Sequence, residues 1–184
     1  MGFADLLFKL GIPYDSPEAV SLAEGVMGFI QARSHRMSRE LAKMRGVFPA
    51  WKGSLWEERG EPMRNATTTT IAPTGTISII CGASSGIEPL FAISFVRNVM
   101  DDDELPEVNP VFEKVAKDGG FYSAELMRRI AKEGTLAHIG EVPQELRRIF
   151  VTSHDINPAA HIDMQAAFQR HTDNAVSKTV NFVN

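Results

Sequence analysis

Apolar side chains recur every three or four residues over the first part of the chain: Val20, Ala23, Val26, Met27 and Ile30. This spacing is typical of an amphipathic helix, and Ser16 followed by Pro17 is a typical helix start. We therefore expect a helix from Pro17 to about Met44. A shorter helix is expected over residues 2–10, because Gly11 supplies a typical end.

Later parts of the chain show the same spacing in shorter pieces. Four helices are expected there: Pro110–Asp118, Ser123–Glu133, Pro143–Phe150 and Pro158 to about His171. β-branched residues and alternating patterns predict extended chain in three places: residues 67–71, 90–99 and 177–183. Residues 48–62 are expected to form an irregular loop that Trp51 and Trp56 pin in place.

The β-branched run ends abruptly at residues 72–78, Ala-Pro-Thr-Gly-Thr-Ile-Ser. Pro73 cannot continue a strand ladder, and Gly75 lets the backbone turn with its N–H groups uncovered before a short helix begins. Three hydroxyls would add donors: Thr74, Thr76 and Ser78. A turn with successive N–H groups at a helix start binds anions. The pattern thus indicates a phosphate-binding turn, although an ordinary strand-turn in any α/β protein has the same spacing.

The composition is that of one ordinary globular domain, with 184 residues of which 43% are hydrophobic and 23% charged. A formal net charge of -4 gives no reason to expect nucleic-acid binding. No apolar run approaches the roughly 20 residues of a membrane span. Cys81 is the single cysteine, so no internal disulfide can form. We expect a soluble, cytoplasmic protein.

Two sets of side chains raise the question of a metal site. The acidic run Asp101–Glu104 has no His or Asn at ligand spacing, and consecutive carboxylates point in different directions, so a solvated turn is expected. His154, His161 and His171 are seven and ten residues apart, with a helix-disfavouring Asn-Pro pair between the first two. We expect no metal site. Basic residues gathered between 33 and 64 fit a solvated helix face.

Two longer segments carry a family resemblance. Residues 65–78, Asn-Ala-Thr-Thr-Thr-Thr-Ile-Ala-Pro-Thr-Gly-Thr-Ile-Ser, and 84–91, Ser-Ser-Gly-Ile-Glu-Pro-Leu-Phe, closely resemble the substrate-phosphate loop region of vitamin B12-dependent (class II) ribonucleotide reductases. The resemblance continues in residues 1–5 and 10–14 before the loop, and in residues 165–169 and 173–182 after it. It implies that residues 1–184 are a single partial domain, late in the catalytic barrel and incomplete at both ends. The implied fold class is α/β, as a helix-rich part of a ten-stranded α/β barrel.

The resemblance also implies roles for the turn. In that family the main-chain amides and hydroxyls of this loop hold the substrate phosphate, while a proline at the place of Pro73 shapes the turn. The phosphate-binding role falls on five residues here: Thr74, Gly75, Thr76, Ile77 and Ser78. Further implications are a ribonucleotide substrate, adenosylcobalamin as the cofactor, and an external dithiol reductant such as thioredoxin. A homodimer is left open.

The family's radical chemistry needs a cysteine within an Asn-x-Cys-x-Glu motif and two more cysteines that deliver reducing equivalents. Cys81 lies between Ile80 and Gly82, does not match that motif, and is expected to be a small buried hydrophobe. No catalytic residue is therefore expected in this chain. An Asp-x-His-x-x-Gly cobalamin motif is absent, but class II members do not need one, so the choice between class II and class I rests on the loop sequence.

Two other functions stay open from the sequence. An unrelated phosphate-dependent enzyme could use the same turn with Glu88 as its acid or base, although the adjacent Pro89 favours a structural turn. A noncatalytic helical interaction module would use the long amphipathic helix and the basic residues. An Asn-x-Cys-x-Glu motif upstream in the same reading frame would distinguish the reductase from both.

Overall fold

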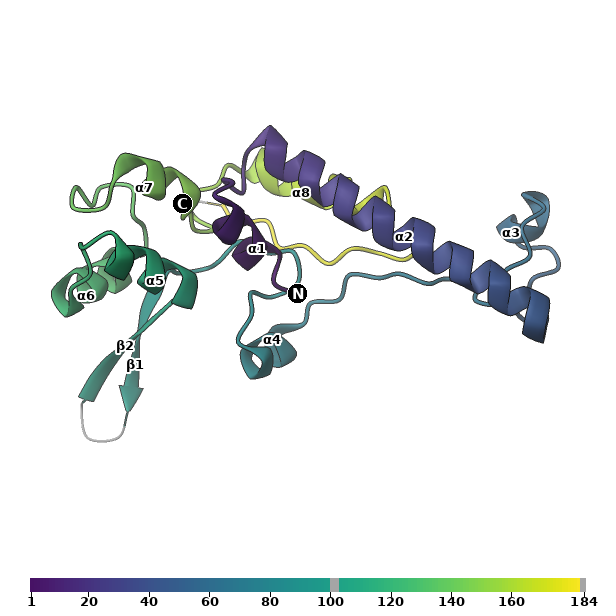
Figure 1. Cartoon of the computed structure of the whole chain (residues 1–184), viewed down its shortest axis with the longest axis horizontal. Helices are drawn as coiled ribbons and strands as arrows, with labels where there is room; N and C mark the ends of the chain where they lie inside the picture. The colour runs from purple at the N-terminus through teal and green to yellow at the C-terminus, as the bar shows by residue number, and fades with distance from the viewer. Residues whose placement is uncertain (100–102, 183–184) are drawn as a thin grey trace.

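The computed structural model describes residues 1–99 and 103–182, with the side chains of residues 96–106 outside that description. The molecule is elongated and mainly helical (Figure 1). Its longest element, α2 (Pro17–Arg45), runs along it and packs against α8 (Pro158–Gln169). The short α1 (Phe3–Leu10) lies near one end of this pair. Among the described helices, none is both long and apolar enough to cross a membrane.

Local capping explains where the first two helices begin and end. The Ser16 hydroxyl accepts a hydrogen bond from Ala19 N at 3.1 Å, and Pro17 occupies the first turn of α2. Gly46 ends α2, and Gly11 ends α1 in the left-handed region. Both predicted helices are confirmed.

The remaining described helices are shorter: α3 (Leu55–Glu58), α4 (Gly75–Cys81), α5 (Pro110–Asp118), α6 (Ala124–Glu133) and α7 (Gln144–Ile149). All four helices predicted late in the chain are confirmed, with ends that differ by no more than about one turn. Asn109 caps α5, Ser123 caps α6 and Asn157 caps α8. The one-turn α3 was not predicted.

The tryptophans pin the loop before the turn, as the sequence predicts. Trp51 Nε1 donates to Glu61 O at 2.9 Å, and Trp56 Nε1 donates to Ala66 O at 2.8 Å. The Trp51 bond closes residues 48–62 on themselves, and the Trp56 bond ties them to the chain that leads into the turn. Helix α3 interrupts the irregular loop predicted here.

A single antiparallel hairpin is the one sheet of the described residues, formed by β1 (Ser94–Val99) and β2 (Asp103–Val108). The predicted extended segment 90–99 is confirmed from Ser94 onward. Strand β2 was missed because its sequence, Asp-Glu-Leu-Pro-Glu-Val, is poor in strand-forming residues, and pairing with β1 decides its conformation. Of the predicted acidic turn, Asp101 and Asp102 lie outside the described residues, whereas Asp103 and Glu104 are part of β2, so the prediction of a turn is wrong for these two.

The strands predicted at residues 67–71 and 177–183 are wrong as regular strands over the described residues. Both segments run extended, but they share one isolated parallel bridge, Ile71 with Val176. Ser177 N donates to Ile71 O at 2.9 Å beside it. On the other side of the bridge Ile71 N donates to Ala175 O at 3.4 Å and Asn174 N donates to Thr69 O at 3.1 Å. Beyond these backbone bonds a side chain is the acceptor, because Thr68 N donates to the Asp173 carboxylate at 2.7 Å. Val183 lies outside the described residues.

Among the described residues, buried apolar side chains form two cores, and α1 contributes to both. Phe3 and Leu7 enter the first core, between α2 and α8, where Phe3 meets Phe168 edge to face at 5.0 Å. Phe8 enters the second, where its ring lies 4.6 Å from that of Phe150. The second core joins α5, α6 and the chain around α7. Helix α1 therefore fixes the two halves of the molecule to each other.

Candidate functional site

The turn at residues 73–78 contains a strained backbone. Thr74, the residue before α4, has φ 55° and ψ 24°, and it is the one non-glycine residue with positive φ in the described part of the chain. The sequence predicts that Gly75 supplies the conformational freedom, but Gly75 is not left-handed. A β-branched residue in this region costs on the order of 1–2 kcal/mol. Other contacts must therefore hold Thr74.

Residues 84–86 supply those contacts. Gly86 N donates to Thr74 Oγ1 at 2.8 Å, and the Ser85 hydroxyl donates to Pro73 O at 2.6 Å. Gly86 is left-handed, and a Cβ there would lie 3.4 Å from Ala72 O. Glycine thus permits the close approach that lets this segment lock the turn.

The locked turn leaves three amides uncovered. The first hydrogen bond within α4 runs from Ser78 N to Thr74 O at 3.0 Å, so the preceding N–H groups have no acceptor within the helix. These N–H groups belong to three exposed residues: Gly75, Thr76 and Ile77. A Cβ built on Gly75 would meet no atom within 4 Å. Three adjacent amides at a helix start are chemically suited to an anion.

The hydroxyls contribute less than the sequence suggests. Ser78 is buried and its Oγ donates to Gly75 O at 2.7 Å, so both its N–H and its hydroxyl serve the turn itself. Thr74 Oγ1 is occupied as the acceptor for Gly86 N. Thr76 is exposed at the helix start. The structure gathers all six predicted residues from Pro73 to Ser78, but Pro73, Thr74 and Ser78 shape the turn through these hydrogen bonds.

The segment that locks the turn is anchored to both halves of the molecule. Ser84 N donates to Asp5 Oδ2 at 2.6 Å, which ties the segment to α1. The Tyr14 hydroxyl donates to Ile87 O at 2.7 Å. Glu88 accepts from Thr179 N at 2.7 Å and from Lys178 Nζ at 2.5 Å. These hydrogen bonds therefore fix the position of the turn relative to α1 and to the last extended segment.

Lys178 binds Glu88 and His161 in a cluster, here called the clamp, that the sequence analysis did not predict. Its side chain is only 2% exposed, and Nζ donates to Glu88, to His161 Nδ1 at 2.8 Å and to Thr179 O at 2.5 Å. These three bonds use all the ammonium hydrogens. His161 Nε2 lies 3.3 Å from Ser153 O, which assigns its proton to Nε2 and leaves Nδ1 as the acceptor. The sequence feature that could have indicated this cluster is the single lysine, Lys178, inside the strand predicted at residues 177–183.

Burial and the Glu88 carboxylate act on the Lys178 ammonium in opposite directions. Burial lowers the pKa of Lys178, and the hydrogen bond and charge of Glu88 oppose that shift. Burial, followed by the Lys178 charge, lowers the pKa of His161. Burial, followed by the Glu88 charge, raises the pKa of Tyr14 well above its usual value. Glu88 is thus committed to Lys178, which agrees with a structural turn and not with a free acid or base.

Asp173 fixes the register of the two extended segments. Its carboxylate accepts from Thr68 N at 2.7 Å, from Thr68 Oγ1 at 2.9 Å, and from Gln31 Nε2 at 3.2 Å, and lies 2.8 Å from His35 Nε2. Burial alone would raise its pKa, but these hydrogen bonds outweigh burial and lower it. The pair with His35 ties both segments to α2.

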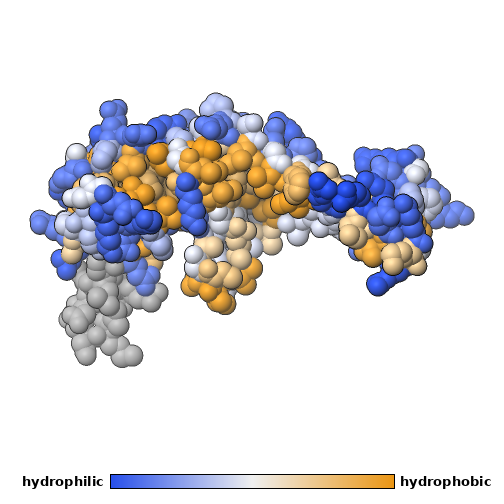
Figure 2. All heavy atoms as spheres, viewed as in Figure 1, coloured by the Kyte–Doolittle hydropathy of each residue, from blue (hydrophilic) through white to orange (hydrophobic). Residues whose placement is uncertain are grey.

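Cys81 is exposed at the end of α4, so the prediction of a buried cysteine is wrong. Ile79 and Ile80 beside it are 79% and 78% exposed. The reason is that α4 stands away from both cores and buries only Ser78. Figure 2 shows this apolar projection below the body of the molecule.

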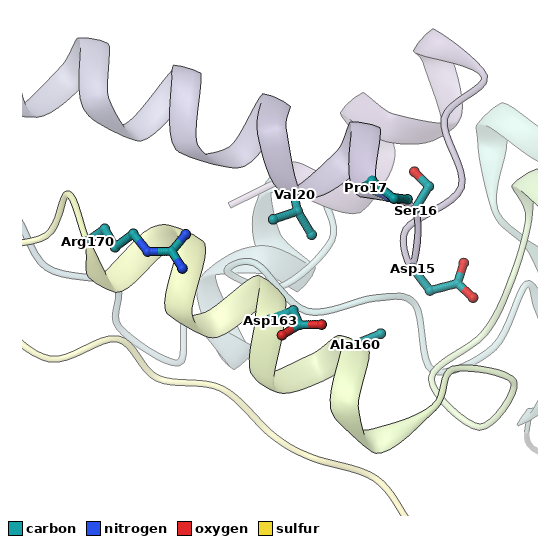
Figure 3. Close-up of a pocket in the computed structure, with 7 residues that line it drawn as sticks. All are labelled: Asp15, Ser16, Pro17, Val20, Ala160, Asp163 and Arg170. Carbon is teal, nitrogen blue, oxygen red and sulfur yellow. The ribbon is translucent and has the colours of Figure 1, made fainter.

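A metal cluster and a cavity between α2 and α8 are two further places where chemistry could lie. Among the described residues, no group of three His, Cys, Asp or Glu side chains is arranged to hold a metal ion. A cavity of about 310 Å³ lies between α2 and α8, with Val20 and Asp163 on its two sides (Figure 3). Its lining residue Arg170 pairs with Glu24, outside that lining. We assign this cavity no role.

A cavity of about 350 Å³ lies beside the turn and the clamp. Its polar lining comes from the anchored segment, from the chain before α8 and from the last extended segment: Ser84, Ser85, Glu88, Ser153, Thr179 and Asn181. The Ser153 hydroxyl is buried and has no hydrogen-bond partner within the described structure. Open polar space therefore adjoins the turn.

Comparison with known proteins identifies the family. The family model described as "Ribonucleotide reductase, barrel domain" matches residues 1–62 and 57–184. The chain therefore belongs to the ribonucleotide reductase family and represents part of its barrel domain, which confirms the resemblance seen in the sequence.

Individual relatives refine this assignment. The chain is 58% identical over 181 residues to a vitamin B12-dependent ribonucleoside-diphosphate reductase of Thermoplasma acidophilum, covering 98% of this chain and 23% of that protein. A protein of the same name from Mycobacterium tuberculosis strain H37Rv is 51% identical, with 98% and 25% covered. The chain spans about a quarter of the length of these relatives.

A solved structure supports the fold. The Actinobacillus ureae class Id ribonucleotide reductase alpha subunit matches with a TM-score of 0.77 and 27% identity, covering 94% of this chain and 30% of that one. The helix-rich fold described above is thus that of part of a reductase alpha subunit.

Removal of the Lys178 ammonium should destabilise the protein. We expect Lys178→Met to cost about 3 kcal/mol, because it leaves the Glu88 carboxylate without its cation. Thermal unfolding of the 184-residue chain measures this as a lower midpoint. Lys114→Met is the matched control, since Lys114 pairs with Asp118 on the surface, and its midpoint should barely move. Equal midpoints for the two variants would contradict the clamp.

The clamp also predicts a pH dependence of stability. The pKa of His161 is lower in the folded protein than its usual 6.5, so below that pH the unfolded chain binds more protons. Stability present above pH 6.5 is therefore lost as the pH falls through and below this value. We expect His161→Asn, which keeps an acceptor for Lys178, to reduce the drop in unfolding midpoint on acidification. His154→Asn, at an exposed position, should leave the drop unchanged. The same drop in both variants would refute this assignment.

Proposed function

We propose that this chain is the substrate-phosphate-binding part of a ribonucleotide reductase. The observation that carries the proposal is the set of three uncovered amides of Gly75, Thr76 and Ile77 at the start of α4. Its relatives are named ribonucleoside-diphosphate reductases, which makes a ribonucleoside diphosphate the proposed substrate. The phosphate would accept hydrogen bonds from these amides, with Pro73, Thr74 and Ser78 shaping the turn.

The contribution of the turn to the reaction is positional. Fixing the phosphate places the ribose at a set distance from the reacting groups of the intact protein, and a displacement near 1 Å costs on the order of 100-fold in rate. The strained Thr74 and its contacts to residues 85 and 86 serve this purpose, because they hold the amides in place before the substrate arrives.

The reacting groups are proposed to lie outside this chain. Adenosylcobalamin is the proposed cofactor of the intact protein, where it supplies the initiating radical when bound. The 51–58% identity to vitamin B12-dependent relatives, against 27% for the class Id structure, favours this class. No metal-holding cluster occurs among the described residues, and we assign the cofactor no contact on this chain.

The assignment to the ribonucleotide reductase family also underlies the proposed barrel fold, reductant, compartment and oligomeric state of the intact protein. The parallel bridge between Ile71 and Val176 is consistent with two neighbouring strands of a ten-stranded α/β barrel. An external dithiol such as thioredoxin would deliver reducing equivalents in the cytoplasm, and a homodimer is compatible with the family. Family membership sets aside the unrelated phosphate-dependent enzyme, and no described contact favours a noncatalytic interaction module.

Gly75→Val tests the turn in the full-length reductase that carries this sequence. A Cβ at Gly75 meets no protein atom, so the fold should tolerate the change while the side chain blocks the approach of a phosphate. We expect a higher KM and a kcat/KM lower by roughly 100-fold, with cobalamin binding retained. Gly140→Val is the matched control, because its Cβ would also meet open space, and its kinetics should be normal. Normal turnover by Gly75→Val at low substrate would overturn the assignment.

An activity assay of the purified chain and the Cys81→Ser variant test whether the radical chemistry is carried out by residues outside this chain. The proposed reaction needs three cysteines, and this chain has one, without the flanking Asn and Glu. The purified chain should therefore form no deoxyribonucleotide from any ribonucleotide with adenosylcobalamin and a dithiol. Cys81→Ser in the full-length enzyme should keep most activity, as expected for an exposed position away from the reacting groups. Turnover by the chain alone, or an inactive but folded Cys81→Ser enzyme, would contradict this.

A further inference from the structure

A third cavity, of about 540 Å³, lies where the base of the hairpin meets α6. This volume falls within the range typical of small-molecule sites. Figure 1 shows α6 beside the hairpin, on the opposite side of the hairpin base from α4. None of the residues that line it belongs to the turn at 73–78 or to the clamp. The cavity is therefore separate from the proposed substrate site.

Two uncommitted cations line this cavity. Arg128 and Lys132 are four residues apart on α6, so they lie on the same face of the helix. Within the described structure neither forms an ion pair, whereas the neighbouring Arg129 pairs with Glu141 at 2.5 Å. His154 adds a third nitrogen-bearing side chain. In a chain with a net charge of -4, this concentration of free positive charge favours an anionic ligand.

A buried hydroxyl also lacks a partner at this cavity. Ser94 is 1% exposed, and its Oγ has no hydrogen-bond partner in the described structure. Ser94 lines the same cavity as Arg128 and Lys132. Buried polar groups in folded proteins are almost always hydrogen-bonded. A ligand oxygen held by the two cations would supply the missing partner.

Two exposed phenylalanine side chains also line the cavity. Phe91 is 69% exposed and Phe95 is 48% exposed, although both line the cavity. The His154 ring meets Phe91 edge to face, with centroids 5.0 Å apart. The face of a phenylalanine ring beside two cations suits a ligand that carries both a flat ring and a negative charge.

We propose that this cavity binds a small phosphorylated ligand with a flat ring, of the nucleotide class. Its phosphate lies against Arg128, Lys132 and the Ser94 hydroxyl, and its ring lies against Phe91 and Phe95. The site is independent of the proposed substrate turn. It does not require the turn to bind phosphate at all.

Photolabelling of the full-length protein tests this site. The probe is 8-azidoadenosine triphosphate, and peptide mapping reads the label on peptides that contain Phe91, Phe95 or residues 128–134. We expect label there, and about tenfold less in the double variant Arg128→Ala, Lys132→Ala, because each cation contributes charge-assisted hydrogen bonds. Arg129→Ala is the matched control and should keep the label, since Arg129 is committed to Glu141.

Further variants and competition measurements distinguish the possible outcomes of the labelling experiment. Gly75→Val should keep the label at these peptides, because the two sites are independent. Inorganic pyrophosphate should compete with the probe more strongly than adenosine does. If the alanine pair unfolds, the glutamine pair, which keeps the side-chain stems, is tested in its place. Absence of label at these peptides, equal label in the double variant, or equal competition by adenosine would overturn the proposal.

Discussion

The register between two extended segments, residues 66–74 and 172–179, is the constraint on which the rest of the structure depends. Asp173 sets it, because its carboxylate replaces a backbone acceptor for Thr68 and joins both segments to His35 of α2. Beyond Asp173, one segment runs into the turn and the other carries Lys178 to Glu88. A shift of one residue between them would separate Lys178 from its partner and move the turn relative to α1.

The strain at Thr74 is compensated through this register. A left-handed threonine costs free energy locally, and the bonds from Gly86 and Ser85 offset that cost. Their segment is held in turn by Asp5, Tyr14 and Lys178, which come from distant parts of the chain. Strain placed next to uncovered amides is typical of a preorganised binding site. The same logic explains why Glu88 and Lys178 are locked to each other instead of being free for catalysis.

Local features of the sequence predicted most of the helices, because caps such as Ser16 and helix ends such as Gly11 act within a few residues. The turn at residues 73–78 was predicted, but not the contacts that hold it; its role as a phosphate site stays a prediction. Thr74 adopts the left-handed conformation because of contacts from Ser85 and Gly86, 11 and 12 residues further on, and no pattern within the turn encodes that. Lys178 was missed for the same reason, since its partners are 17 and 90 residues away. Cys81 was misplaced because a composition rule cannot tell that α4 stands away from both cores.

The most direct test of the central claim is a crystal structure of the full-length reductase with a ribonucleoside diphosphate bound. The account predicts that phosphate oxygens lie within hydrogen-bond distance of the main-chain nitrogens of Gly75, Thr76 and Ile77. Thr74 should stay left-handed whether the site is filled or empty. A diphosphate bound elsewhere, with these three amides facing solvent in an ordered turn, would contradict the account.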